Sequence, residues 1–502
     1  MQEFDVVIIG SGMGGLVCAN LLGQEGLRVC VLEKNRQFGG CLQTFVRDRV
    51  IFDSGVHYIG GLEKGQNLYQ ILKYIGVMDK LKLEKLDEDA FDKIIVGGDP
   101  NEYPFAQGYE NFISKLSACF PGEEQAIRKY CDAMREVCSK FPLYNLVTDG
   151  KLEDKTSAMD IGAKQFIESV TGNKKLQEVL AGDNLLYVGY PETPFYIHAL
   201  IINSYIESSY KCINGGSQLS KILVQNIRNH GGEIIRNCEV KKIHAEGDKV
   251  VYVETDKGTH IHAKHFISNV HPVKTMEMTD SSLIRGAYRH RLKGLKNTIS
   301  SFCVHIVLKK KSLKYVNNNY YYFKEGRVWT MADYTEENWP LGYALFFTHS
   351  AKSKGWADSM TIFSYMKYEE TEPWKKSFNT VSYASERGEG YESFKKRKAE
   401  KLIETVEERF PGLKDCIVSY YTTTPLSYRD YIGTDDGSLY GVAKDYRDSL
   451  KTFISSRTKL QNLFLTGQNL NVHGVLGTAI GGLLTCILLL GSDGIVEKIR
   501  NA

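Results

Sequence analysis

The stretch Asp5-Val-Val-Ile-Ile-Gly-Ser-Gly-Met-Gly-Gly-Leu16 lies close to the start of the 502-residue chain. Residues 4–9 end in the apolar, β-branched run Val-Val-Ile-Ile, which predicts a buried strand. Residues 16–22 favour a helix, and residues 27–33 form a second apolar run that predicts another strand. The glycine-rich turn therefore lies between a strand and a helix, within one βαβ unit.

Three glycines of this turn, Gly10, Gly12 and Gly15, have the spacing of a dinucleotide-binding fingerprint. Gly10 permits the tight turn, Gly12 lets the backbone approach a pyrophosphate, and Gly15 lets the helix pack on the strand. The pyrophosphate would lie at the helix N-terminus, where free N–H groups and the helix dipole favour an anion. Glu33 ends the second strand, where its carboxylate would accept hydrogen bonds from ribose hydroxyls and repel the 2′-phosphate of NADP. A glycine turn without a ligand is the alternative, and the sequence favours the dinucleotide site.

Composition excludes several classes of protein. Hydrophobic residues make up 42% and charged residues 25% of the chain, which is an ordinary globular balance. The 63 Lys and Arg residues against 60 Asp and Glu residues leave a net charge of +3, which gives no reason to expect a nucleic-acid partner. The 11 cysteines include no Cys-x-x-Cys pair, so we expect buried thiols of a reducing compartment rather than disulfides or a zinc site. No secretory signal precedes the first strand, so we expect a cytoplasmic protein.

Glycine-rich and strand-rich character appears three times along the chain, at the start, in the middle and at the end. Residues 70–205 are expected to be mostly helical, with helices over 111–140 (interrupted at Pro121-Gly122), 153–181 and 195–209. Residues 275–450 are expected to alternate between strands and helices. We therefore predict one domain assembled from residues 1–75, 210–275 and 455–502, and a second domain assembled from residues 76–209 and 276–454.

The stretch from Gly474 to Gly491 contains no charged residue, so a membrane span and a buried helix are both candidates. Five glycines and two threonines interrupt its apolar side chains. Small residues permit close packing on a sheet, on another helix or on a cofactor. The composition therefore favours a buried helix.

The opening stretch, with Leu32-Glu-Lys34 and Gly39-Gly-Cys-Leu-Gln-Thr-Phe45, resembles the FAD-binding amine oxidase and phytoene desaturase superfamily. Asp53-Ser-Gly-Val-His-Tyr-Ile-Gly60 is similar to the all-trans-retinol 13,14-reductase (retinol saturase) family and its bacterial relatives. The resemblance implies an α/β fold, with a discontinuous, glutathione reductase-like Rossmann-type FAD-binding domain and an inserted α+β substrate domain. The vertebrate reductase has a histidine where this chain has Gln43, and we expect no N-terminal membrane-targeting segment like the one it carries.

The resemblance also assigns cofactor contacts. The residues implied for the ADP moiety of FAD are Gly10, Ser11, Gly12, Gly14, Gly15, Glu33 and Lys34. The residues implied beside the ribityl chain and the pyrophosphate are Gly39, Gly40, Cys41 and Leu42. Val240 is implied to contact adenine, and Gly467, Val475 and Leu476 are implied to lie near the pyrophosphate and the flavin.

His57 and Tyr58 lie where the family chain passes close to the isoalloxazine ring. Our hypothesis is that one of them supplies or orients the proton for reduction of a carbon–carbon double bond, and a packing role in the flavin pocket is the alternative. For Cys41 we expect backbone contact with the cofactor rather than a covalent flavin link. The histidines of His260-x-His262-x-x-His265 lack an evident fourth ligand, so we expect no metal site there.

The function implied by the resemblance is that of an FAD-dependent oxidoreductase acting on carbon–carbon double bonds of a hydrophobic, conjugated polyene such as a retinoid or carotenoid. Saturation by hydride from reduced flavin N5 is the favoured direction. The alternatives are a carotenoid desaturase or isomerase, a flavin amine oxidase or protoporphyrinogen oxidase-like enzyme, and a non-enzymatic flavin-containing binder of hydrophobic ligands. A second dinucleotide motif is absent from the sequence, so electrons are expected from a transiently bound donor, for which NAD(P)H is a candidate.

Two further regions have two interpretations each. The basic run 285–296, with Lys309-Lys310-Lys311, is either a solvated face or a peripheral contact with anionic lipid head groups. The aromatic-rich region 320–347 is either core sheet or the lining of a substrate tunnel.

Overall fold

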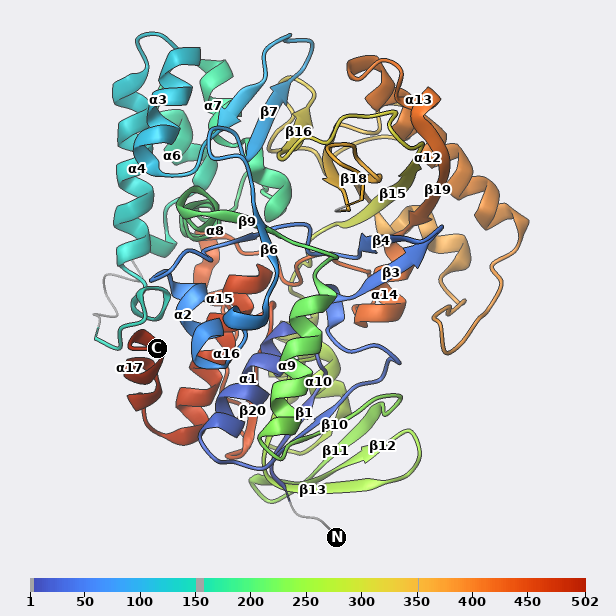
Figure 1. The fold of residues 1–502 in the computed structure, drawn as a ribbon. Helices are drawn as coiled ribbons and strands as arrows, with labels where there is room; N and C mark the ends of the chain where they lie inside the picture. The colour runs from blue at the N-terminus through green and yellow to red at the C-terminus, as the bar shows by residue number, and fades with distance from the viewer. Residues whose placement is uncertain (1–3, 150–157, 351) are drawn as a thin grey trace.

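The computed structural model describes residues 4–149, 158–350 and 352–502. Its two largest sheets occupy different halves of the molecule, the eight-stranded sheet below and the seven-stranded sheet above in Figure 1. The cofactor fingerprint belongs to the eight-stranded sheet, and most of the aromatic-rich region belongs to the seven-stranded one.

The eight-stranded sheet has the order β10-β2-β1-β13-β12-β11-β14, and β20 pairs with β13. Its strands are β1 (Phe4–Ile9), β2 (Val29–Leu32), β10 (Glu233–Ile235), β11 (Val240–Glu246), β12 (Lys249–Thr255), β13 (His260–Ser268), β14 (Thr279–Asp280) and β20 (Leu463–Leu465). The strands β10, β2, β1, β13 and β20 run parallel, whereas β11, β12 and β13 form an antiparallel meander. Parallel strands bring their carboxyl ends to one edge, so Gly10 and Glu33 meet there.

Helices cover this sheet closely. Helix α1 (Met13–Gln24) follows the glycine turn and packs against α9 (Ser217–Asn229) and α16 (Gly474–Leu490). A Cβ atom at Gly482 would lie 3.2 Å from the Gly14 carbonyl oxygen, so only glycine lets α16 approach α1 so closely. The buried-helix interpretation of this stretch agrees with that packing. Within the described parts of the chain, none of the helices has the length and apolarity that crossing a bilayer requires.

The seven-stranded sheet has the order β19-β15-β18-β17-β16-β7-β8. Its strands are β7 (Asp92–Val96), β8 (Tyr103–Phe105), β15 (Ser300–Leu308), β16 (Asn319–Phe323), β17 (Gly342–Thr348), β18 (Ser359–Met366) and β19 (Ile417–Thr423). The expectation that residues 70–205 are mostly helical is wrong at β7, β8 and the short strand β6 (Leu83–Lys85). The cause is tertiary, because β7 pairs in parallel with β16, more than 200 residues later in the chain.

The remaining part of residues 70–205 is helical. Helices α3 (Tyr109–Cys119) and α4 (Glu124–Ser139) are separated at Pro121-Gly122, as the sequence predicts. The helix expected over 153–181 begins outside the described residues, and its described part forms α6 (Ala163–Val170) and α7 (Lys174–Leu180). Helix α8 (Phe195–Glu207) is buried along most of its length and leads to β9 (Ser209–Cys212), the central strand of a three-stranded sheet with β5 (Ile59–Gly60) and β6.

Smaller elements complete the chain. They are β3 (Thr44–Arg47), β4 (Val50–Asp53), β5 (Ile59–Gly60), α2 (Asn67–Tyr74), α10 (Pro272–Met278), α11 (Gly286–Lys293), α12 (Glu389–Arg409), α13 (Leu413–Cys416), α14 (Pro425–Ile432), α15 (Ser449–Thr452) and α17 (Gly494–Arg500). The strands of the eight-stranded sheet come from residues 4–32, 233–280 and 463–465, and those of the seven-stranded sheet from residues 92–105 and 300–423. The domain boundaries given above stay a prediction.

Candidate active site

A cavity of about 490 Å³ opens at the carboxyl ends of β1 and β2 and is lined by both large sheets. Fourteen of the residues predicted from the sequence line it: Gly10, Ser11, Gly12, Gly14, Glu33, Lys34, Gly39, Gly40, Cys41, Leu42, His57, Tyr58, Val240 and Val475. The other three predicted residues lie around it. Gly15 supports the turn, Gly467 packs against Gly14, and Leu476 lines a second chamber that is described below.

The glycine turn is packed so that only hydrogen fits at its key positions. A Cβ atom would lie 2.7 Å from Asn269 Nδ2 at Gly12, and 2.3 Å from the Gly10 carbonyl oxygen at Gly15. Gly10 itself has a φ angle of +94°, which favours glycine. No described side chain caps the N-terminus of α1, and its first turn contains no acidic residue. The exposed backbone donors and the helix dipole therefore fit a diphosphate group.

Glu33 is buried, with 5% of its surface exposed, and is already oriented by neighbouring donors. Its Oε2 accepts hydrogen bonds from the Ser11 backbone N–H at 3.0 Å and from Ser11 Oγ at 2.5 Å. Its Oε1 accepts a hydrogen bond from the Asn35 backbone N–H at 2.8 Å. A carboxylate offers about four lone-pair positions, so one stays free for a ribose hydroxyl.

Lys34 connects the end of β2 to helix α14. Its Nζ donates to the Asp430 carbonyl oxygen at 2.9 Å, and Asn35 Nδ2 donates to the Tyr431 carbonyl oxygen at 2.9 Å. The Asp430 carboxylate is fully buried and is paired with the guanidinium of Arg387. Lys34 therefore anchors the far side of the cavity as well as lining it.

Cys41 lies in the cavity wall beside Gly55, where a Cβ atom would lie 3.1 Å from the Cys41 Cβ. Burial raises the pKa of the Cys41 thiol to about 11, so it is protonated near neutral pH. A protonated thiol is a poor nucleophile. This chemistry agrees with the expected backbone contact, and the absence of a covalent link stays a prediction.

His57 and Tyr58 lie where the two sheets meet. The His57 ring stacks on Phe346, with ring centroids 4.0 Å apart and planes inclined by 5°. Burial, followed by the nearby charge of Lys211, lowers the pKa of His57 to about 3, so its ring is neutral at physiological pH. The Tyr58 hydroxyl donates to Asp92 Oδ2 at 2.6 Å and lies 2.7 Å from the Tyr321 hydroxyl. Of the two, Tyr58 has the hydrogen-bonded hydroxyl that proton transfer requires.

Sequence reasoning missed several residues of the cavity wall. Asn269 follows the end of β13, so the rule that ligands bind beyond the carboxyl ends of parallel strands would have found it. Tyr321 and Phe346 belong to core strands and also line the cavity. The aromatic-rich region 320–347 therefore contains core-sheet residues that also form part of a cavity wall. Asp92 belongs to no recognisable sequence motif, and only the folded chain brings it into hydrogen-bond contact with Tyr58.

Two of the three histidines of β13, His260 and His262, pack against the ring of Tyr252. The His260 ring stacks on Tyr252 with centroids 4.2 Å apart, and the His262 ring lies 5.4 Å from the same tyrosine. In the described residues no group of three or more His, Cys, Asp or Glu side chains is arranged to hold a metal ion.

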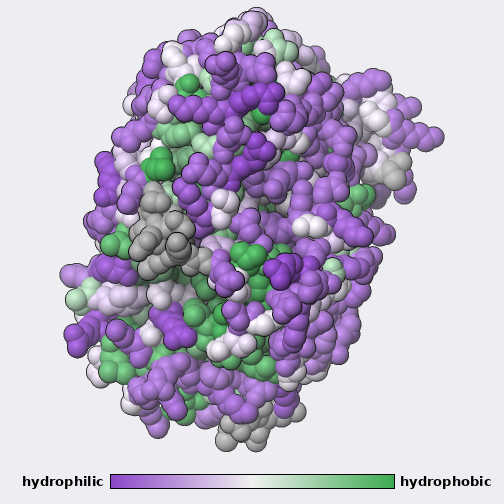
Figure 2. All heavy atoms as spheres, turned by 90° about the vertical axis from the view of Figure 1, so that its left-hand side faces the viewer, coloured by the Kyte–Doolittle hydropathy of each residue, from purple (hydrophilic) through white to green (hydrophobic). Residues whose placement is uncertain are grey.

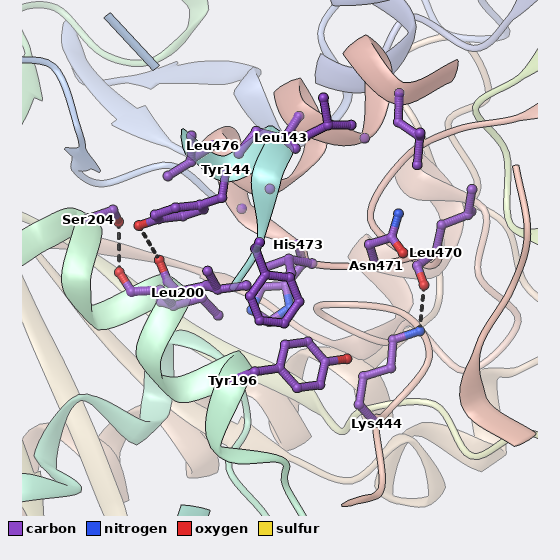
Figure 3. A pocket seen from close by; sticks show the side chains of 18 of the residues that line it. Leu143, Tyr144, Tyr196, Leu200, Ser204, Lys444, Leu470, Asn471, His473 and Leu476 are labelled. Atoms are coloured by element: carbon purple, nitrogen blue, oxygen red, sulfur yellow. Dashed lines mark hydrogen bonds between the residues drawn. The ribbon is translucent and has the colours of Figure 1, made fainter. Parts of the chain in front are cut away.

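A second chamber of about 360 Å³ adjoins the first (Figure 3). Leu186, Tyr205, Gly474 and Val475 line both spaces, so the two spaces share a wall at the start of α16. Most of the remaining lining is apolar and comes from α8, from α16 and from the turn Pro142–Asn145: Leu143, Leu200, Ile201, Leu476, Ile480 and Leu484.

Two basic side chains of this chamber are already bonded to backbone carbonyl oxygens. Lys444 Nζ donates to the carbonyl oxygens of Thr452, Asn469 and Leu470 at 2.9–3.0 Å, and burial lowers the pKa of Lys444 to about 7. The His473 ring nitrogen lies 3.0 Å from the Leu186 carbonyl oxygen. Of the described residues that line the chamber, none is an aspartate or a glutamate. The chamber therefore suits an apolar molecule better than an ionic one.

Comparison with known proteins places this geometry in a family. Residues 13–483 match the model of the family described as flavin containing amine oxidoreductase. The all-trans-retinol 13,14-reductase of Danio rerio is 29% identical over 526 residues, which cover 97% of this chain and 85% of that protein. Prolycopene isomerase 1 of an Oncidium hybrid cultivar is 24% identical, over 99% of this chain and 85% of that protein. An oxidoreductase structure from Methanosarcina mazei aligns with a TM-score of 0.65 at 17% identity, over 96% of this chain and 99% of that one.

These findings confirm the α/β fold with a Rossmann-type FAD-binding part, and they confirm the resemblance drawn from the motifs. The glycine turn, the uncapped start of α1 and the oriented Glu33 carboxylate fit the adenosine diphosphate part of FAD. The chain therefore belongs to the flavin containing amine oxidoreductases and is an FAD-dependent oxidoreductase.

Proposed function

We propose that this oxidoreductase saturates a carbon–carbon double bond in a long, apolar, conjugated polyene of the retinoid or carotenoid kind. The observation that supports this most directly is the apolar chamber that shares a wall with the flavin cavity. The similarity to proteins named all-trans-retinol 13,14-reductase points the same way. A hydrocarbon chain needs no hydrogen-bond partner, and burying it contributes about 25 cal/mol per Å² of apolar surface.

The chamber lining also argues against an amine substrate. An alkylammonium group buried without a carboxylate partner costs several kcal/mol. The described lining offers no such carboxylate, and all three Lys444 donors are used by backbone carbonyls. This is why the polyene is preferred here to an amine.

Bound FAD, once reduced, would supply a hydride to one carbon of the double bond. The chain then has to place the substrate and provide a proton for the other carbon. We assign the proton to the Tyr58 hydroxyl, which lines the cavity and is hydrogen-bonded on its far side to Asp92. His57 is neutral and stacked on Phe346, so its task is to shape the wall beside the reacting bond. The electrons come from a transiently bound donor, for which NAD(P)H is our candidate.

The test is anaerobic reduction of the holoenzyme with dithionite, followed by addition of retinoids and carotenoids. We expect the flavin to be reoxidised in proportion to a blue shift of the polyene absorbance, because saturation shortens the conjugated system. A red shift would indicate desaturation, and a change of double-bond geometry without flavin reoxidation would indicate isomerisation. Either result, or peroxide release with an amine, would overturn the proposal.

A variant that fills the chamber tests whether the polyene binds there. Gly481 lines the chamber, and a Cβ atom there would meet no other atom within 4 Å, so Gly481→Phe adds a ring to open space. We expect the KM for the polyene to rise about tenfold, or ~1.4 kcal/mol, with unchanged FAD content. Gly286→Phe is the matched control, because Gly286 is exposed on α11 and also has no atom within 4 Å of its Cβ position. An unaltered KM in Gly481→Phe would place the substrate elsewhere.

We further propose that the protein touches a membrane surface beside this chamber. Leu450 and Phe453 are 75% and 42% exposed, and Phe453 lines the chamber. Figure 2, which faces this side of the molecule, shows apolar side chains gathered among hydrophilic ones. The basic helix α11 lies alongside, because Arg291 donates to the Lys451 carbonyl oxygen at 2.8 Å. Apolar side chains next to cations suit an anionic bilayer surface.

Co-sedimentation with vesicles that contain anionic phospholipid tests this contact. We expect Leu450→Asp to lower the membrane-bound fraction about tenfold, because it replaces an inserted apolar side chain by a charge that the head groups repel. Val418→Asp on β19 is the control, since Val418 is 59% exposed on another element. Equal binding of both variants would show that the chamber side is not the membrane contact.

A further inference from the structure

A carboxyl group without hydrogen-bond partners lies behind the cavity. Asp183, in the short helix η4 (Gly182–Leu186), is 1% exposed, and neither of its carboxylate oxygens has a partner among the described residues. Leaving a charge unpaired in such a place costs several kcal/mol, so the group is held neutral. Burial raises the pKa of Asp183 well above its ordinary value, and the nearby charge of Asp92 raises it further.

A second buried carboxyl group connects this region to the cavity. Asp92 on β7 is fully buried, and its Oδ1 accepts a hydrogen bond from Asn319 Nδ2 at 2.7 Å. Its Oδ2 accepts the 2.6 Å hydrogen bond from Tyr58. Burial raises the pKa of Asp92 to about 7, although its hydrogen bonds and the charge of Lys211 act in the opposite direction. Asp92 is therefore able to hold or release a proton near physiological pH.

The packing brings these groups together from four parts of the chain. Helix η4 packs against β7 and β16, which are the elements of Asp92 and Tyr321. Burial is the main cause that raises the pKa values of Tyr58 and Tyr321, and Asp183 lies close enough that a charge on it would raise them further. Tyr58 and Tyr321 line the flavin cavity, whereas the two aspartates are not among its described lining residues. Hydrogen bonds thus connect Asp92 to Tyr58 and Tyr58 to Tyr321 at the cavity wall, and Asp183 lies behind them without a hydrogen bond.

We propose that Asp92 is a buried proton store that restores the Tyr58 hydroxyl after each reduction, beside an Asp183 carboxyl group that stays neutral. The inference rests on the proposed saturation of a double bond. In that step the Tyr58 O–H bond breaks and a C–H bond forms at the substrate carbon, while the hydride brings both electrons of the reduction. When Asp92 is protonated, the hydrogen between Asp92 Oδ2 and the Tyr58 oxygen belongs to Asp92, so the Tyr58 O–H can face the substrate; after the transfer, the Asp92 hydrogen moves across the 2.6 Å contact to the Tyr58 oxygen. Once the product has left, water in the cavity returns a proton to Asp92 through Tyr58, which lines the cavity. Asp92 acts through Tyr58 and is a positioning residue.

The pH dependence follows from the groups that face Asp92: Tyr58, Tyr321, Asn319, Lys211 and Asp183. Asp92 has its proton below a pH of about 7 and loses it above. Restoration of Tyr58 from Asp92 is therefore expected in acidic and neutral buffer and is expected to fail in alkaline buffer. Asp183, held neutral, keeps its proton across this range.

Infrared spectroscopy of the oxidised holoenzyme tests the store without substrate. In mildly acidic buffer we expect a carboxylic acid C=O band of Asp92, which disappears near neutral pH, and one of Asp183, which persists into alkaline buffer. Burial also raises the pKa of Asp53 to about 7, so Asp53 contributes a separate band that neither Asp92→Asn nor Asp183→Asn removes. Asp92→Asn should remove the titrating band and Asp183→Asn the persistent one, whereas Asp415→Asn, exposed on α13, should remove neither. Spectra without the Asp92 and Asp183 bands, or spectra from which neither substitution removes a band, would overturn the inference.

A kinetic measurement separates a proton store from a merely structural network. Over repeated turnovers the wild-type rate should fall above neutral pH, and Asp92→Asn should lose this pH dependence. An identical pH profile in both proteins would overturn the inference. If wild-type enzyme shows the infrared bands and reduces no polyene, the proposed function fails and the proton store stands.

Discussion

Gly12→Val is expected to leave a folded protein that no longer binds FAD, with affinity weakened at least about 100-fold, or ~3 kcal/mol. The Gly12 backbone has φ −62° and ψ 170°, a conformation open to any residue, so the effect is not backbone strain. A Cβ atom there would lie 2.7 Å from Asn269 Nδ2, and the branched side chain would occupy the space in front of the uncapped start of α1. The visible flavin spectrum and titration of the apoprotein with FAD measure this loss.

Gly98→Val is the matched control for this variant. A Cβ atom at Gly98 would meet nothing within 4 Å, and the residue lies outside the cavity lining. Both apoproteins should have the same far-ultraviolet circular dichroism, which separates lost binding from lost folding. A yellow Gly12→Val protein with normal FAD affinity would contradict the placement of the diphosphate at this turn.

Tyr58→Phe is expected to slow substrate reduction by about 10²–10⁴-fold, the usual contribution of a positioned general acid. The phenyl ring keeps its contact with Tyr205, whose ring centroid lies 4.6 Å away, so FAD content should be unchanged. The substitution leaves Asp92 Oδ2 without its hydrogen bond from Tyr58, which costs about 1–3 kcal/mol of stability. Stopped-flow flavin reoxidation by a saturable polyene, measured in H₂O and in D₂O, reports the proton step.

Tyr383→Phe serves as the control, because Tyr383 is 66% exposed and lies away from the cavity. The solvent isotope effect of the wild type should be absent from Tyr58→Phe if the tyrosine proton is the one transferred. Unimpaired reduction by Tyr58→Phe would assign Tyr58 the packing role that the sequence left open.

The cofactor end of the site could be predicted from the sequence because the residues that form it are neighbours in the chain. A strand, a glycine turn, a helix and a terminal acid follow one another within β1, α1 and β2, so spacing alone fixes how Ser11 and Glu33 meet. The same local reasoning failed for β7, whose pairing partner β16 is distant in the chain. Strand character there is decided by burial in a sheet that periodicity within one segment does not show.

The acidic residues behind the cofactor cavity could not be predicted from the sequence, again because their properties depend on distant parts of the chain. Asp92 and Asp183 lie in no motif, and each resembles an ordinary polar residue until the fold removes it from water. Their properties come from desolvation and from neighbours on β16 and beside β5, which only the three-dimensional arrangement supplies. Tyr58 was singled out by resemblance, whereas the groups behind it required the structure.

The order in which the strands of the eight-stranded sheet are synthesised has a consequence for biogenesis. β1 and β2 emerge first from the ribosome, β13 joins them much later, and β20 and α16 come in the final part of the chain. Long-range pairings of this kind fold slowly and leave unpaired edges in the meantime. FAD that binds only the finished sheet would then stabilise the completed chain, and riboflavin-starved cells would contain less of this protein because proteases remove the cofactor-free chain.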